Sequence, residues 1–166
     1  EVWSNTAFKV KIKDQNLLVT KIPKIEAEII KTEAVTETGQ RFPIKTEILE
    51  NDNKLTILEL DSTDNNLITA WQNIPTLEWN DKDPVIGQTV IGLGSGNSGH
   101  QVSVSIVSTL MSVGPAPIGR GFRTNAATED NIGGPIIDIQ GKVVGMVWGQ
   151  RQAVNQEALV SLVDSN

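Results

Sequence analysis

The sequence predicts an all-β protein of two packed antiparallel six-stranded β-barrels, followed by a short C-terminal helix. Both halves consist of short apolar segments separated by turn residues, a polar segment with prolines lies between them, and the last residues change to a helical spacing. Closing each sheet into a barrel is the usual way to avoid exposed strand edges. We therefore divide the domain into residues 1–62, a linker at 63–84, and residues 85–166.

The first half begins with a segment of strict alternation. Residues 8–13 place Phe8, Val10 and Ile12 on one face and three lysines on the other. The polar turn at residues 14–16 predicts a hairpin with a second strand at residues 17–22. Further strands are predicted at residues 25–32, 41–49 and 55–60.

The second half repeats this organisation and then departs from it. Strands are predicted at residues 88–94, 101–110, 134–139 and 142–148. Near the end, apolar residues at 158, 159, 162 and 163 follow a helical period, with Asn155 as a plausible N-cap and Glu157 in the first turn. These signals predict the terminal helix.

Composition excludes several classes of function. The net charge of −6 argues against a nucleic-acid partner, which normally requires a basic face. The absence of cysteine excludes thiolate catalysis and zinc–thiolate sites, and His100 is the single histidine. No apolar run is long enough to span a membrane, and the acidic loops lack the spacing of a calcium loop. We predict no cofactor, no metal and no membrane insertion by this segment.

Residues 124–149 read TNAATEDNIGGPIIDIQGKVVGMVWG. This stretch resembles the second barrel of trypsin-fold serine proteases of the HtrA type, which carry T-D-A-A, a loop, G-N-S-G-G-P-L and a G-x-V-x-G hairpin. The closing Val-Trp-Gly is similar to the Ser-Trp-Gly of trypsin. The resemblance is strong over residues 85–149 and weaker before them, and it implies the two-barrel trypsin fold.

The resemblance also places the catalytic triad of the family on this sequence. The serine position holds Ile132, the histidine position after LLVT holds Pro23, and the aspartate position before LTILEL holds Lys54. The glycine that supports an oxyanion hole is replaced by Asp130. Loss of the serine alone from such a triad costs about 10⁶-fold in turnover. We therefore expect that the chain is not an enzyme but a pseudoprotease.

Two functions remain open alongside a third of low weight. The first is protein or peptide binding as a scaffold or regulator, with a partner in the former substrate groove or in a neighbouring domain. The second is a structural assembly module with a closed groove. The third is a hydrolase that uses another serine, such as Ser98 beside His100. The candidate peptide contacts are Arg123, Thr124, Ile132, Val147, Trp148 and Gly149. By the resemblance alone, we expect a location outside the cytoplasm.

Overall fold

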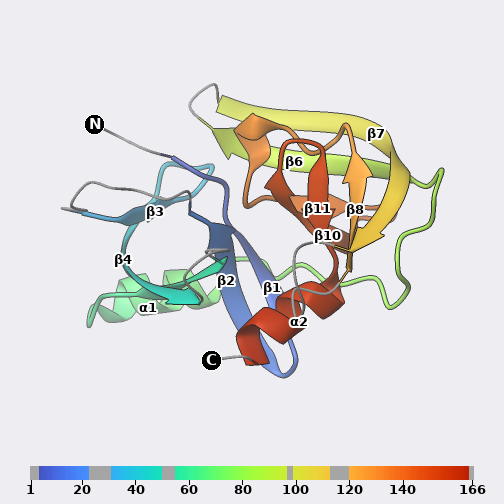
Figure 1. Ribbon diagram of the computed structural model, residues 1–166. Helices are drawn as coiled ribbons and strands as arrows, with labels where there is room; N and C mark the ends of the chain where they lie inside the picture. Colours follow the sequence, from blue (N-terminus) through green and yellow to red (C-terminus); the bar gives the residue numbers. More distant parts are fainter. Residues whose placement is uncertain (1–3, 23–30, 50–54, 97–98, 113–119, 165–166) are drawn as a thin grey trace.

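The computed structural model describes residues 4–22, 31–49, 55–96, 99–112 and 120–164. Its strands form a five-stranded sheet of order β1-β2-β5-β4-β3 and a closed six-stranded barrel of order β10-β11-β8-β7-β6-β9 (Figure 1). All of the strand pairs are antiparallel. The predicted all-β class with a short C-terminal helix is confirmed.

The elements of the first half and the linker are β1 Phe8–Ile12, β2 Gln15–Lys21, β3 Glu33–Val35, β4 Arg41–Leu49, β5 Leu55–Leu60 and α1 Asn65–Gln72. Those of the second half are β6 Thr89–Gly96, β7 Gly99–Ser112, β8 Arg120–Thr124, the 3₁₀ helix η1 Glu129–Asn131, β9 Pro135–Ile137, β10 Val143–Gly149, β11 Gln152–Val154 and α2 Gln156–Asp164.

The first hairpin turns one residue earlier than the sequence predicts. Ile12 pairs with Gln15, so Lys13 and Asp14 form the turn, and Lys13 has a positive φ of 55°. A two-residue turn fits the twist of the flanking strands better than a longer one. The predicted strand at residues 25–32 lies almost wholly outside the described residues, and the described strand that follows it is the three-residue β3.

The barrel of the second half is filled by its own apolar residues. Phe122 is fully buried at its centre, and a Cβ on Gly145 would lie 2.7 Å from the Phe122 ring. Gly145 therefore allows the ring to pack against the β10 backbone. The other buried members of this barrel core are Val90, Val107, Ala126, Ala127, Ile136, Val144, Val147 and Ala153.

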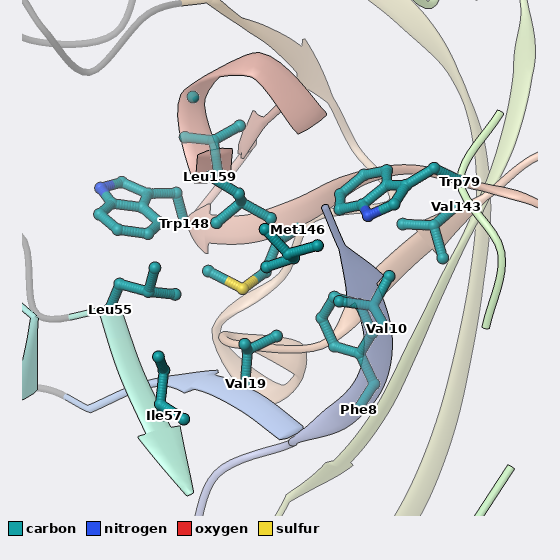
Figure 2. Close-up of a cluster of buried hydrophobic side chains, with 13 residues drawn as sticks. Phe8, Val10, Val19, Leu55, Ile57, Trp79, Val143, Met146, Trp148 and Leu159 are labelled. Atoms are coloured by element: carbon teal, nitrogen blue, oxygen red, sulfur yellow. The ribbon is translucent and has the colours of Figure 1, made fainter. Parts of the chain in front are cut away.

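A second apolar cluster joins the two halves, and we call it the seam. Its residues come from β1, β2 and β5 on one side and from β10, β11 and α2 on the other, with Trp79 from the linker. Figure 2 shows Met146 between Trp148 and Trp79, with Leu55, Val19 and Phe8 facing them from the first half. The alternating apolar faces of β1 and β10 thus bury each other.

The predicted linker contains the helix α1, which the sequence analysis did not foresee. The Asp64 carboxylate accepts the N–H of Asn66 at the start of this helix, and Lys9 donates to the carbonyls of Gln72 and Ile74 at its end. These contacts with the helix ends compensate for its short length. After α1, the linker runs along β10, where Val143 N–H donates to Glu78 and Asn80 N–H donates to Val143.

The terminal helix begins as predicted. The Asn155 side chain accepts the N–H of Ala158 at 3.1 Å, which is the N-cap geometry expected from the sequence. Ala158 and Leu159 on this helix are fully buried in the seam. None of the helices in the described ranges is both long and apolar enough to cross a membrane.

Candidate functional site

The loop before the glycine pair is held by a buried asparagine. The Asn131 side chain donates to the carbonyl of Ala126 at 2.8 Å and accepts the N–H of Thr128 at 2.8 Å. Asn131 is fully buried at the end of η1. These bonds fix the path of the chain into Gly133 and Gly134.

Gly133 brings this loop against the first half of the molecule. It has a φ of 82°, which favours glycine, and a Cβ there would lie 2.5 Å from Thr20 Oγ1 and 2.7 Å from the carbonyl oxygen of Thr6. Thr20 itself donates to that carbonyl at 2.6 Å. The loop that carries Ile132 and the glycine pair therefore lies directly against β2.

The backbone of β10 is already paired next to this loop. Gly133 N–H donates to the carbonyl of Val147 at 2.9 Å, and Val147 N–H donates to the carbonyl of Gly134 at 2.9 Å. Both polar backbone groups of Val147 are thus bound within the chain. An added peptide cannot pair with Val147 unless this loop moves.

The residue at the serine position is half-buried. Ile132 packs against the barrel core, and its side chain has no nucleophilic atom. Asp130 is exposed within η1. The other two triad positions, Pro23 and Lys54, lie outside the described residues.

Lys21 closes the seam beside Trp148. It is half-buried at the end of β2, and its ammonium donates to the carbonyl oxygen of Trp148 and lies 4.7 Å from the centre of the indole ring. Burial lowers the pKa of the Lys21 ammonium from its ordinary value. Among the described residues, no carboxylate forms an ion pair with the Lys21 ammonium.

The predicted peptide contacts are divided between surface and core. Val147 is fully buried, while Trp148 is 5% exposed and Thr124 is 1% exposed. Arg123 is exposed on β8, and Gly149 is half-buried at the end of β10. A Cβ on Gly149 would meet no atom closer than the Gln152 side-chain oxygen at 3.9 Å, so it would make an ordinary van der Waals contact and no clash. The structure thus brings Trp148 and Gly149 together with Lys21, and Arg123 lies on β8, where it pairs with Gln152, the residue that also pairs with Gly149.

Sequence reasoning missed Lys21 as a site residue. The signal was a lysine at the end of the apolar run LLVT, where a buried strand would more often end in a neutral residue. Of the pair proposed for an alternative hydrolase, Ser98 lies outside the described residues and His100 is exposed on β7. Within the described ranges, no group of three His, Cys, Asp or Glu residues is placed to hold a metal.

The chain matches one family of known sequences and several solved structures. The sequence model of the trypsin-like peptidase domain matches residues 13–146. No curated protein matches the chain by sequence. Among solved structures, a serine endoprotease from Yersinia pestis is similar over 95% of this chain and 56% of its own, with a TM-score of 0.69 and 19% identity.

Two further structures share the fold at similarly low identity. The inactive form of Rv3671c from M. tuberculosis has a TM-score of 0.74 and 16% identity, over 98% of this chain and 81% of its own. The HtrA-type protease AlgW with a tripeptide has a TM-score of 0.72 and 16% identity, over 97% of this chain and 55% of its own. The chain thus spans little more than half of the Yersinia protein and of AlgW.

These matches contradict the expectation that the chain is not an enzyme. The matching family is one of peptidases, and two of the three structures named above are described as proteases. The expectation depended on three positions carried across from a distant family, and two of them, Pro23 and Lys54, fall on residues that the structure does not describe.

Proposed function

The chain belongs to the trypsin-like peptidase domain family, and on that premise we propose that it binds a protein or peptide segment at the seam beside Trp148. The segment would carry a carboxylate, which would bind the Lys21 ammonium. The observation that carries this proposal is that Lys21 holds a half-buried charge with no acidic partner among the described residues.

The electrostatics of Lys21 favour such a ligand. Partial burial removes water from the ammonium, which among the described residues contacts the Trp148 carbonyl and ring. A carboxylate would supply a full opposite charge where solvent screening is reduced. A segment with a free carboxylate therefore gains more at this site than a neutral one.

The backbone next to the Lys21 contact is not crowded. Gly149 adjoins the Trp148 carbonyl, a Cβ on it would make only an ordinary contact with the Gln152 side-chain oxygen at 3.9 Å, and its φ is outside the range that requires glycine. An extended segment that approaches an accessible strand can form main-chain hydrogen bonds, as in strand addition. Three of the similar structures, all of AlgW, contain a tripeptide or a decapeptide, which supports a peptide as the class of ligand.

Fluorescence polarisation with two labelled octapeptide pools tests the proposal. The first pool carries Asp or Glu at each varied position, and the second carries Asn or Gln there. We expect binding of the acidic pool only, and loss of that binding in Lys21→Met because the substitution removes the charge and keeps much of the apolar length. Mass spectrometry of the recovered peptides reports any hydrolysis in the same samples.

Lys11→Met is the matched control, since Lys11 is exposed on β1 and the substitution changes the net charge equally. The control should bind the acidic pool as the wild type does. Equal binding of both pools, or a Lys21→Met variant that binds as tightly as the wild type, would contradict the proposal.

The second candidate function is an assembly module with a closed groove. It is favoured by the buried side chains of Val147 and Trp148 and by the pairing of both Val147 backbone groups within the chain. On this alternative, neither pool binds at the seam, and partners bind to outer surfaces instead. The polarisation experiment thus separates the two candidates.

A further inference from the structure

The outer face of the β6–β7 hairpin carries exposed apolar side chains. Val102, Val104 and Ile106 alternate along β7 and are 66%, 66% and 51% exposed. Register pairs Val102 with Leu93 and Val104 with Ile91 on β6, and both of these partners are half-buried. We call these five residues the β7 face. In Figure 1 the hairpin runs along the side of the barrel opposite α2.

The apolar surface extends beyond the hairpin at one end. Val85 and Ile86 are 61% and 65% exposed, and the adjoining Gly87 N–H donates to the carbonyl of Val107 on β7. Soluble monomers rarely expose contiguous apolar patches of more than a few hundred Å² unless the patch binds something. The β7 face therefore requires an explanation.

Charge separates this region from the rest of the chain. The sequence contains no Asp, Glu, Lys or Arg between Asp83 and Arg120, although charged residues make up 20% of the whole chain. A lipid surface or a nucleic acid would normally be met by lysine or arginine, which this segment lacks. A protein surface with an apolar, uncharged centre is the fitting partner.

A second copy of the chain is the partner that the distribution of charge favours. Each copy carries a net charge of −6, so two copies repel each other wherever their charged surfaces meet. In a two-fold contact, each residue near the axis faces itself or its close neighbours, so charges on such a face would meet like charges. The β7 face avoids this repulsion because its side chains are uncharged.

The arrangement of the β7 face also fits a two-fold axis. An axis through Val104 would place Val104 against its symmetry mate and Val102 against Ile106 of the second copy. β7 pairs with β6 through residues 99–106 and with β8 through residues 107–112, and the exposed side chains of Val102, Val104 and Ile106 stand on the face of this sheet, so the proposed contact is made between faces. Two twisted sheets can pack in this way with interdigitated side chains.

We propose that the β7 face is a self-association surface through which two copies of this domain pair about an axis near Val104. This inference goes beyond the proposed function, because the surface does not include Lys21, Trp148 or Gly149. The β7 face consists of five residues, fewer than the roughly 20 to 30 residues per partner of a standard interface, so we expect a weak dimer that forms reversibly.

Sedimentation velocity of the wild-type domain tests the proposal. The experiment covers roughly 5 to 500 µM, a range in which weak dimers dissociate measurably. We expect the weight-average sedimentation coefficient to rise with concentration. Val104→Asp should weaken the dimer at least about tenfold, because two facing carboxylates would lose water and repel.

Val35→Asp is the matched control. Val35 is 55% exposed on β3 of the other sheet, so the same substitution is made at a similarly exposed valine away from the β7 face. This variant should associate as the wild type does. Thermal unfolding of both variants checks that neither substitution has unfolded the domain.

A mixture of two variants tests whether the two-fold axis passes near Val104. Val104→Asp and Val104→Lys should each be monomeric alone, and an equimolar mixture should dimerise because opposite charges then face each other. A monomeric wild type over the whole range, or an effect of Val35→Asp equal to that of Val104→Asp, would overturn the proposal. A mixture that stays monomeric would exclude the axis at Val104.

Two measurements distinguish failure of the proposed dimer from failure of the proposed peptide binding. Val104→Asp should leave binding of the acidic peptide pool unchanged, since the β7 face does not include the seam residues that would bind a peptide. Lys21→Met should leave dimerisation unchanged for the same reason. Capture of a different protein on the β7 face of a monomeric wild type would contradict the second copy as the occupant.

Discussion

Two strands of the same barrel present apolar residues on their outer faces with opposite results. On β10, Val143, Met146 and Trp148 point outward and are at most 5% exposed, because the first sheet, Trp79 and α2 cover them (Figure 2). On β7, Val102, Val104 and Ile106 are at least half exposed. The barrel closes by the same antiparallel pairing at both strands, so pairing does not determine which face is buried.

The difference lies in which segments of the chain cover each strand. Backbone hydrogen bonds tie the linker to β10 at Val143, and the Lys21 side chain reaches the Trp148 carbonyl from the first half. On the β7 face, the pairs Val104–Ile91 and Val102–Leu93 remain accessible to solvent or to a partner. The apolar outer face is therefore buried in the seam on β10 and accessible to solvent or a partner on β7.

The largest contrast between the faces should appear in alanine substitutions. Trp148→Ala should lower the free energy of unfolding by about 3 to 5 kcal/mol, since it leaves a cavity in the seam. Val104→Ala should change it by less than about 0.5 kcal/mol, because the side chain is mostly exposed. Urea unfolding followed by far-UV circular dichroism measures both values. Equal losses would show that the β7 face is also buried in the folded domain.

Gly133 should show how closely the two halves approach. Gly133→Ala should lower the free energy of unfolding by about 2 to 4 kcal/mol, from the positive φ and from contact with Thr20 and the Thr6 carbonyl. Gly141 has the same φ of 82° and nothing within 4 Å of an added Cβ, so Gly141→Ala should cost about 1 to 2 kcal/mol.

The difference between the two glycine variants isolates the contact term. The free energy of unfolding of each variant is measured by urea unfolding at one pH. The backbone strain from the positive φ is common to both variants, so it cancels when the two losses are subtracted. A Gly133→Ala loss no larger than that of Gly141→Ala would mean that Thr6 and Thr20 yield without cost, and that the halves are not packed tightly at this loop.

Much of the fold could be predicted from local pattern. The alternation at Phe8, Val10 and Ile12 and the Asn155 cap depend on neighbouring residues, and both features are present as predicted. The helix α1 was missed because its residues NNLITAWQ include several weak helix formers. Its stability depends on contacts made by Lys9 from β1, which local sequence does not reveal.

The candidate site was harder to predict because its residues meet across the seam. Lys21 and Trp148 are distant in sequence, and neither has a local pattern that indicates the contact. The sequence did predict the strands on either side of the glycine turn at Gly141, and the structure has β9 and β10 there. Burial of Trp148 could not be predicted, since it depends on how the first sheet and α2 cover β10, whereas Val147 is buried inside the second barrel itself.

The smallest predicted effect is on how the free energy of unfolding depends on acidic pH. It concerns the side of the second barrel where the linker covers β10, which we call the covered side. Asp138 follows β9, is buried, and accepts bonds from the backbone of Gln140 and Lys142 and from the Asn80 side chain of the linker. Desolvation raises the pKa of Asp138, but the hydrogen bonds from Lys142, Asn80 and Gln140 and the Lys142 charge together lower it below its ordinary value.

The sign of the pH effect follows from that lowered pKa. The unfolded chain takes up a proton at Asp138 near pH 3.9, roughly the ordinary value, and the folded chain does so only at lower pH. The stability that Asp138 contributes is therefore complete above about pH 4 and is lost as pH falls through the folded pKa. Asp138→Asn should cost about 1 to 2 kcal/mol at pH 7 and should lose less further stability in acid than the wild type.

Glu33→Gln is the matched control for Asp138→Asn, because it removes a carboxylate that lies away from the covered side. The pKa of Glu33 is also lowered, mainly by Lys31 and Arg41, but Glu33 lies on β3, away from β10. Urea unfolding from pH 6 to pH 2.5 should show a weaker acid dependence in both variants, and only Asp138→Asn should also alter the near-ultraviolet signal of Trp79. An unchanged Trp79 signal would mean that the bond from Asn80 to Asp138 does not hold the linker against β10, and that Trp79 and the backbone bonds at Val143 suffice to cover that face.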